Sequence, residues 1–336
     1  MLSRLRRAAP AVCLRTLRHE TTQSQTWFGI GPGSTIADLT PQLHRLKLAE
    51  DRFVLHDKAP VSVAAHHLAT QRLTWCLVVD DDASAVGMVT ERDLLRYSTH
   101  AESLAFFSGG KEDPCVNAWM TKREDMLSVR LDDTLEHAAS LMKSGIWRHL
   151  PVLDYWGKLH SILDLRDVVS ACWGEYGERT WENRLVADVL GAKRRNVIGE
   201  PQGSSWTEQL QAYLLAQSER HTVSVRAPVA EAALKLASER LTFLVVVDGP
   251  KVLGLVTERS FLSFCVGFQN SAGPESGVHS IMTPIDQVVT VSLTDPASTC
   301  IDKFYMHNLR HLPVVNKSNL IGIISARDML RPLLPN

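Results

Sequence analysis

Two Asp side chains stand three residues after a hydroxyl-bearing residue, in a pattern typical of a strand that leads into a helix. Asp93 follows Thr90, and Asp328 follows Ser325. A carboxylate in the first turn of a helix accepts hydrogen bonds, and its simplest role is to cap that helix. The other role is to bind the hydroxyl groups of a ligand, with the Ser or Thr donating to an anion beside the helix N-terminus. One residue can fill both roles.

Two Arg-His pairs supply hydrogen-bond donors elsewhere in the chain. Arg148-His149 and Arg310-His311 each precede the residues Leu-Pro-Val. The planar guanidinium group fits carboxylate or phosphate oxygens, and the imidazole adds a further ring nitrogen. These pairs therefore indicate either an anionic ligand or a neighbouring carboxylate of the protein itself.

Other charged and metal-binding residue types suggest no further site. His307 and His311 have the spacing that could ligate zinc on one helix, but Pro313 and the strand pattern around it place them on different elements. No metal site is expected. We expect Glu91 and Glu258 to point to solvent.

The residues above recur because the chain is an internal repeat. Gly87–Leu95 returns as Gly254–Leu262, and Arg148–Val152 returns as Arg310–Val314, so the chain consists of two similar halves. Each half divides again, because a terminal Asp like Asp93 also ends the second part of each half. We call the position of this Asp the terminal position of a unit; unit three has Ser260 there. In all four units, the terminal position follows the residue that enters the second strand of the unit by 18 or 19 residues.

Within a unit, the pattern predicts the order strand, helix, strand, turn, strand, helix. In the second unit, Asp133 and Glu136 form a capping-box-like helix start, and residues 150–153 and 159–163 flank a short turn as a hairpin. In the last unit, residues 288–291 read as a strand, and Asp295 with Pro296 can begin a helix. The two helices carry core-facing stripes at helical spacing: Leu135, Ala138, Ala139 and Met142 in one, and Cys300, Ile301, Phe304 and Tyr305 in the other.

This unit resembles a cystathionine beta-synthase (CBS) domain. The resemblance rests on Met-Thr after the first segment, Arg-His-Leu-Pro-Val on the second strand, and G-h-h-[ST]-x-x-D, with h apolar, before the last helix. It implies a mixed α/β (α+β) fold of four β-α-β-β-α repeats in two Bateman modules, similar to mitochondrial CBS-pair proteins and to the gamma subunit of AMP-activated protein kinase. The expected ranges are 34–175 for the first module (units 34–100 and 114–173) and 184–335 for the second (units 184–267 and 278–335).

The resemblance also implies clefts that bind AMP, ADP, ATP or S-adenosylmethionine. The Asp would hold the ribose, and the hydroxyl and the Arg-His pair would face the phosphate. Carried over residue by residue, the expected nucleotide-binding residues are Thr90, Asp93, Arg148, His149, Asp167, Thr257, Arg310, His311, Ser325 and Asp328.

The four clefts are unequal. Units one and four keep both the hydroxyl and the Asp. Unit two has Asp164 in place of the hydroxyl, and a second carboxylate there should repel phosphate. Unit three has Ser260 in place of the Asp, which replaces a charge-assisted hydrogen bond by a weaker neutral one. We expect one competent site in each half.

Composition excludes several classes of function. The chain has 336 residues, with 36 Lys and Arg against 37 Asp and Glu, so no overall field attracts nucleic acid or anionic lipid. No apolar run is long enough for a membrane span, and the six Cys form no C-x-x-C pair. Residues 1–22 are rich in Arg and poor in acidic residues, which predicts a mitochondrial transit peptide; a cytoplasmic tail is the alternative.

Motifs of catalysis, such as G-x-S-x-G, H-E-x-x-H and the P-loop, are missing, and the CBS-like units occupy nearly the whole chain. The sequence therefore predicts a non-catalytic regulatory protein that senses adenine nucleotides and acts on a target protein, such as a kinase or a mitochondrial enzyme. It would be a monomeric four-repeat disc or a homodimer. The alternatives are a scaffold protein with decayed clefts, or a minor hydrolase or redox activity at an unrecognised site.

Overall fold

The structure is a computed structural model, and it describes residues 33–39, 51–100, 113–143, 147–172, 184–190, 220–249, 251–267, 273, 275–307, 309–316 and 319–330. The predicted transit peptide, residues 1–22, lies outside the described residues.

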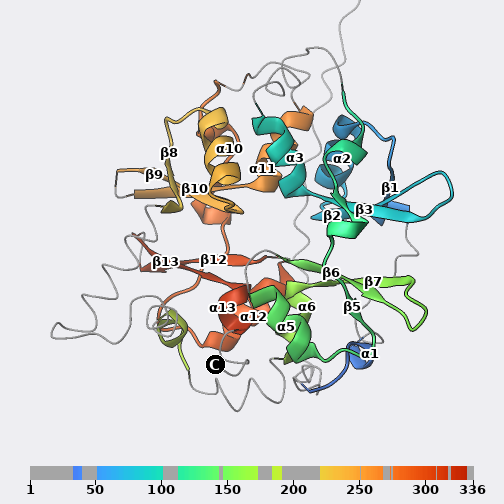
Figure 1. The fold of residues 1–336 in the computed structure, drawn as a ribbon. Helices are drawn as coiled ribbons and strands as arrows, with labels where there is room; N and C mark the ends of the chain where they lie inside the picture. The colour runs from blue at the N-terminus through green and yellow to red at the C-terminus, as the bar shows by residue number, and fades with distance from the viewer. Residues whose placement is uncertain are drawn as a thin grey trace, which may run out of the picture.

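The described residues form four α/β units, which occupy the four corners of Figure 1. Unit one holds β1 (Val54–His56), α2 (Val61–Thr70), β2 (Trp75–Val79), β3 (Ala85–Thr90) and α3 (Glu91–Thr99). Unit two holds β5 (Val129–Arg130), α5 (Leu135–Lys143), β6 (His149–Leu153), β7 (Leu159–Asp164) and α6 (Leu165–Cys172). Unit three holds β8 (Thr222–Ser224), α10 (Val229–Ser238), β9 (Phe243–Asp248), β10 (Lys251–Thr257) and α11 (Glu258–Gly267). Unit four holds α12 (Ala297–Met306), β12 (His311–Asn316), β13 (Asn319–Ser325) and α13 (Ala326–Leu330).

The sheets of units one and three share one topology. In unit one, β1 pairs parallel with β2, and β2 pairs antiparallel with β3. A short strand beyond each unit, β4 (Thr121–Lys122) or β11 (Thr283–Pro284), adds to β3 or β10. The repeated Met-Thr of the sequence thus marks the chain returning to the sheet of the preceding unit.

This return explains the repeated Gly at the middle of the second hairpin strand. A Cβ atom on Gly87 would lie 2.6 Å from the backbone oxygen of Thr121 and 2.7 Å from Met120 Sδ, and one on Gly254 would meet the backbone oxygen of Thr283. Backbone this close leaves no room for any larger side chain, so the glycine permits the fourth strand to pair.

The two units of each module pack sheet against sheet. Trp75, Leu77 and Met88 of unit one contact Ile162 of unit two. Phe243, Val245 and Val252 of unit three contact Ile323 of unit four in the same way.

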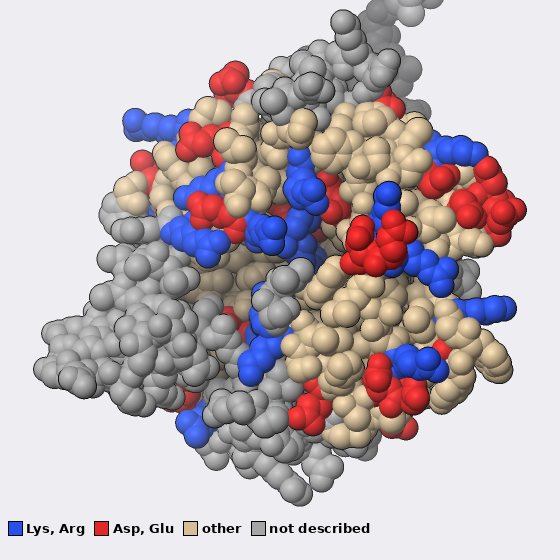
Figure 2. Space-filling model, in the orientation of Figure 1, with Lys and Arg blue, Asp and Glu red and all other residues tan. Residues whose placement is uncertain are grey.

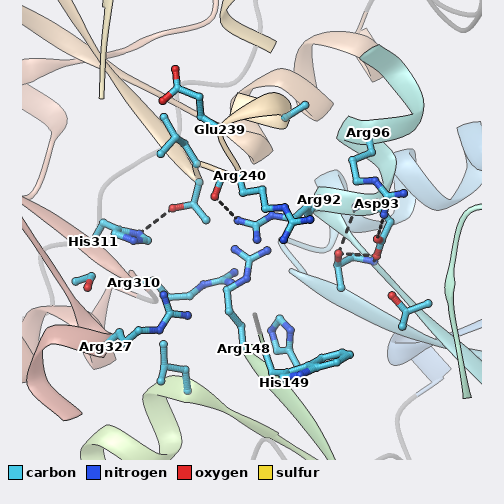
Figure 3. A pocket seen from close by; sticks show the side chains of 18 of the residues that line it. Arg92, Asp93, Arg96, Arg148, His149, Glu239, Arg240, Arg310, His311 and Arg327 are labelled. Carbon is cyan, nitrogen blue, oxygen red and sulfur yellow. Dashed lines mark hydrogen bonds and ion pairs between the residues drawn. The ribbon is translucent and has the colours of Figure 1, made fainter. Parts of the chain in front are cut away.

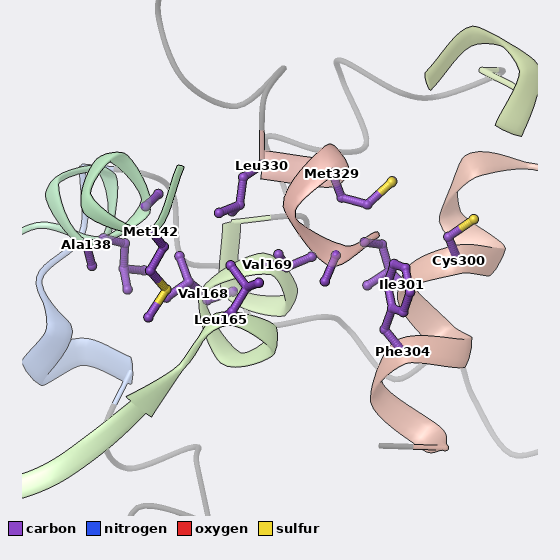
Figure 4. Close-up of a cluster of buried hydrophobic side chains, with 14 of the residues drawn as sticks. Ala138, Met142, Leu165, Val168, Val169, Cys300, Ile301, Phe304, Met329 and Leu330 are labelled. Carbon is purple, nitrogen blue, oxygen red and sulfur yellow. The ribbon is translucent and has the colours of Figure 1, made fainter. Parts of the chain in front are cut away.

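The two modules pack helix against helix. Leu262 of α11 enters the core of unit one, and Leu95 of α3 enters the core of unit three. Units two and four share a single core, in which α5, α6, α12 and α13 meet around buried side chains such as Val168, Phe304 and Met329 (Figure 4). The four units consequently close around a common centre.

Two segments pack away from the units that their sequence positions suggest. In α1 (Ile36–Leu39), Ile36 N donates to Asp133 O of unit two, and Ile36 and Leu39 belong to the core of units two and four. In the second half, Val186 N donates to Asp295 O of unit four. In each module, the segment that precedes the first unit in the sequence therefore packs against the second unit.

The local predictions have two outcomes. The hairpin of unit two is confirmed as β6 and β7, and its helix stripe is buried as predicted. The predicted strand over residues 288–291 is wrong: within it only Val291 forms a bridge, with Val314 of β12, and an extended segment becomes a strand only where a partner pairs with it.

Candidate functional site

A cavity of about 760 Å³ lies where the four units meet. Figure 2 shows basic side chains gathered around a hollow at the centre of one face. Seven Arg side chains line the cavity, against three carboxylates. The charged lining residues are Arg92, Asp93, Arg96, Asp125, Arg148, Arg220, Glu239, Arg240, Arg310 and Arg327. The wall is therefore locally basic although the chain as a whole is nearly neutral.

One corner of the cavity is the end of β3 and the start of α3. Asp93 Oδ2 accepts hydrogen bonds from Thr90 N at 3.0 Å and from Thr90 Oγ1 at 2.7 Å, and Thr90 Oγ1 accepts from Asp93 N at 3.4 Å. This is a capping box, so the capping role expected for Asp93 is present. The other carboxylate oxygen, Oδ1, lies 3.7 Å from Arg96 Nη1. Burial raises the pKa of Asp93, while Thr90 and Arg96 oppose that rise.

The same turn is repeated in the other units with different chemistry. Asp328 Oδ2 accepts from Ser325 N at 2.8 Å and from Ser325 Oγ at 2.7 Å. In unit three, Thr257 Oγ1 and Ser260 Oγ lie 3.0 Å apart and carry no charge. Units one and four thus present a carboxylate at this turn, and unit three presents only hydroxyl groups.

In unit two, the extra carboxylate of Asp164 forms an internal ion pair with Arg166. Arg166 donates from Nε to Asp164 Oδ1 at 2.8 Å and from Nη2 to Oδ2 at 2.9 Å. Burial alone would raise the pKa of Asp164, but Arg166 and His149 together hold it well below its usual value. The repulsion that the sequence suggested is therefore neutralised within the protein.

His149 and His311 bridge the two units of their modules. His149 Nε2 lies 3.2 Å from Asp164 Oδ2 and 3.4 Å from Thr74 Oγ1 of unit one. His311 Nδ1 lies 2.9 Å from Thr242 Oγ1 of unit three. Burial lowers the pKa of His149 to about 4, so the ring is neutral at physiological pH. His149 therefore does not add positive charge to the cavity.

Glu91 and Glu258 were expected to face solvent, and that prediction is wrong. Their side chains are only 7% and 3% exposed, and each is held by arginines of the opposite module. Glu91 Oε1 accepts from Arg259 Nε at 2.8 Å, and Glu91 Oε2 lies 4.0 Å from Arg310 Nη2.

Glu258 repeats this arrangement with the roles of the modules exchanged. Glu258 Oε1 accepts from Arg92 Nε at 3.0 Å, and Glu258 Oε2 accepts from Arg148 Nη1 at 3.4 Å. We call the six residues of these two clusters the central lock. Burial and the charge of Arg148 lower the pKa of Arg92, whereas Arg148, Arg92 and Arg310 lower the pKa of Glu258 against the effect of its burial.

The repeat carries a signal for this lock that the sequence prediction did not use. Each unit has an Arg immediately before the terminal position, and only units one and three have a Glu before that Arg. The four arginines are Arg92, Arg166, Arg259 and Arg327, and Arg327 Nε donates across the modules to Met142 O at 3.1 Å.

Seven of the ten residues predicted to bind nucleotide line the cavity: Thr90, Asp93, Arg148, His149, Arg310, His311 and Ser325. Asp167, Thr257 and Asp328 do not lie among its lining residues. Several arginines that do, including Arg92, Arg96 and Arg240, were not predicted. The binding role of all these residues stays a prediction.

Within the described residues, no group of three or more His, Cys, Asp or Glu side chains could hold a metal ion. The same part of the chain contains no helix that is long and apolar enough to cross a membrane.

Comparison with known proteins identifies the repeat. The CBS domain profile matches residues 48–100, 116–174, 215–267 and 278–334. The chain belongs to the CBS domain family. Its four CBS domains form two Bateman modules, with the mixed α/β fold that the sequence predicted. The family matches comprise CBS domains alone, which are typically non-catalytic regulatory modules.

Two of the curated relatives are longer proteins than this chain. CBSCBSPB3 from Arabidopsis thaliana is 26% identical over 271 residues, which cover 76% of this chain and 45% of that protein. The meiotically up-regulated gene 70 protein of Schizosaccharomyces pombe is 26% identical over 314 residues, which cover 81% of this chain and 40% of that protein. This CBS protein thus spans less than half the length of either relative.

Solved structures share the fold. Protein MJ1225 from Methanocaldococcus jannaschii, a proposed archaeal homolog of g-AMPK, superposes with a TM-score of 0.64 at 15% identity, covering 83% of this chain and 94% of that one. CBSX2, solved in complex with AMP, is 30% identical with a TM-score of 0.33, covering 41% of this chain and 96% of that one. The likeness to MJ1225 extends to all four units, and at this identity it concerns the fold.

Proposed function

We propose that this CBS-domain protein binds an adenine nucleotide in the central cavity and passes the state of that cavity to a partner protein. The observation that carries the proposal is the corner at Thr90 and Asp93, where a buried carboxylate and a hydroxyl group open onto a wall of arginines. This combination suits a ligand that has both neutral hydroxyl groups and a charged phosphate.

Each part of a nucleotide has a matching group at this corner. The carboxylate of Asp93 can accept from ribose hydroxyl groups, as the family resemblance implies. Met88 and Met126 offer adaptable apolar surface to a base on the same side of the cavity. Arg96 and Arg148 supply donors for phosphate. The excess of arginine favours AMP, ADP or ATP over S-adenosylmethionine, because the sulfonium group of the latter is positively charged.

The central lock offers a route from ligand to surface. Arg148 both lines the cavity and donates to Glu258 of the other module at 3.4 Å. A phosphate group that accepts a hydrogen bond from Arg148 competes with Glu258 for the same guanidinium group. When the inter-module bond weakens, the two modules adjust relative to each other. The ligand shifts the balance between two arrangements only as far as it binds one better, typically by about 1–3 kcal/mol.

The test is a thermal-shift titration of the full chain with AMP, ADP, ATP and S-adenosylmethionine, beside GMP. We expect saturable stabilisation by the adenine nucleotides, of about 2.7 kcal/mol at a ligand concentration 100 times the dissociation constant. Asp93→Asn should weaken binding, whereas Asp82→Asn, the same change at an exposed turn, should leave binding unaltered. The proposal fails when no nucleotide stabilises the folded wild type, or when Asp93→Asn binds as tightly as wild type.

A scaffold function is the second candidate. In units one, three and four, the residue at the terminal position is hydrogen-bonded to the Ser or Thr at the start of its own helix. These bonds stabilise the helix without a ligand, which favours a scaffold. Affinity capture separates the two: a partner whose capture changes with nucleotide supports the sensor, and one whose capture is constant supports the scaffold. We also propose that the protein acts in mitochondria on a target such as a kinase or a mitochondrial enzyme. It would do so as a monomeric four-repeat disc or as a homodimer.

A further inference from the structure

Arginines from different units converge at the centre of the cavity, beyond the corner at Asp93. Figure 3 shows the guanidinium groups of Arg92, Arg148 and Arg310 directed toward one another. The side chains of Arg148 and Arg310 are each 10% exposed. The Nη1 atom of Arg310 is buried and has no hydrogen-bond partner in the described part of the chain.

The charges at this junction do not balance. Four arginines of the central lock face two glutamates, which leaves two positive charges in excess. Arg240, whose backbone oxygen accepts from Arg92 Nη2 at 3.0 Å, adds another guanidinium group to the cavity wall. Burial, and to a smaller extent the nearby charge of Arg148, lowers the pKa of Arg310 to about 10. Like charges held this close in a partly dry site are unfavourable until an anion joins them.

We propose that the junction of the four CBS units binds an inorganic condensed phosphate chain. A single orthophosphate offers oxygens on one centre only. A chain of three phosphates offers anionic oxygens along its length, so it can meet Arg148, Arg240 and Arg310, which come from three different units. Binding of the inorganic chain does not depend on adenosine or on Asp93.

Sodium tripolyphosphate is the probe, titrated into the full chain at constant ionic strength by calorimetry, beside orthophosphate. We expect one tripolyphosphate per chain, bound at least about tenfold more tightly than orthophosphate. Arg310→Gln should weaken tripolyphosphate binding by about tenfold to a hundredfold, because it removes charge-assisted hydrogen bonds. Arg240→Gln changes an exposed side chain at the cavity wall and should weaken binding severalfold without disturbing the fold. Arg226→Gln, the same change at an exposed position away from the cavity, is the matched control.

The outcomes separate this inference from the proposed function. It is overturned when tripolyphosphate binds no better than orthophosphate, or when Arg240→Gln and Arg310→Gln both bind as Arg226→Gln does. Binding of AMP without binding of tripolyphosphate overturns the junction site alone. Binding of tripolyphosphate with no response to any adenosine ligand supports the junction site and refutes the nucleotide sensor. Asp93→Asn separates the junction from the nucleotide corner. Tripolyphosphate that binds Asp93→Asn as tightly as wild type, while ATP binds it less tightly, supports the junction site; tripolyphosphate binding that weakens as much as ATP binding overturns it.

Discussion

Glu258→Gln should destabilise the protein more than any exposed charge removal, because Glu258 holds two arginines of the opposite module. Its side chain is 3% exposed, and it accepts from Arg92 at 3.0 Å and from Arg148 at 3.4 Å. Removing one partner of a buried ion pair costs about 3–5 kcal/mol, since the remaining charge stays buried. Arg92 is 20% exposed and keeps a bond to Arg240 O, so we expect the lower end, about 3 kcal/mol.

Urea denaturation followed by tryptophan fluorescence measures this loss, with Glu231→Gln as the matched control at an exposed position of α10. The uncompensated arginines should also make the variant bind tripolyphosphate more tightly than wild type. A Glu258→Gln protein within about 0.5 kcal/mol of Glu231→Gln, which is the usual effect of a surface substitution, would show that the lock contributes nothing and would refute the reasoning.

The sign of the pH dependence follows from the lowered pKa of Glu258. A carboxylate whose pKa is lower in the folded state contributes its stability above the ordinary glutamate pKa, and that contribution is lost as the pH falls through the folded-state value. The difference in stability between wild type and Glu258→Gln should therefore be constant near neutral pH and shrink under acid conditions. A difference that grows on acidification contradicts the assignment.

Three further predictions concern other parts of the chain. The pKa of His149 falls from 6.5 to about 4 on folding, so stability should decline as the pH drops from about 6.5 toward 4; thermal midpoints of His149→Asn should decline less, and parallel curves would contradict this. Gly87→Ala should cost about 1–3 kcal/mol through the clash with Thr121 O, whereas Gly273→Ala, which meets nothing within 4 Å, should not; equal urea midpoints would exclude the close approach as the cause. Residues 1–22 fused to a fluorescent reporter should direct it to mitochondria; a reporter that stays in the cytoplasm supports the cytoplasmic alternative.

Local patterns in the sequence predicted the elements that depend on near neighbours. The stripe from Leu135 to Met142 is buried because residues three and four apart share one face of a helix whatever the rest of the chain does. The hairpin of β6 and β7 needs only a short turn between two apolar runs. The strand expected at 288–291 failed because an extended segment becomes a strand only where a partner pairs with it, and there only Val291 finds one.

The candidate site also has one part that the sequence predicted and one part that it did not. Its corner at Thr90 and Asp93 was predictable, since the residues are three apart and their geometry follows from the strand-to-helix turn. The arginine-rich junction was not. Arg240 is brought to Arg92 by packing between α3 and the helices of unit three, and no pattern within either segment specifies that contact.

The sequence by itself determined the four-unit repeat, the order of elements in each unit, and the residues that form the turns. Repetition and periodicity are properties of neighbouring residues, so they are visible without a fold. The tertiary structure decided which charges are paired. Glu91 and Glu258 read as solvent-facing because a charged side chain avoids burial without a partner. Their partners, Arg259 and Arg92, lie 168 and 166 residues away, and only the closure of the two modules brings them together.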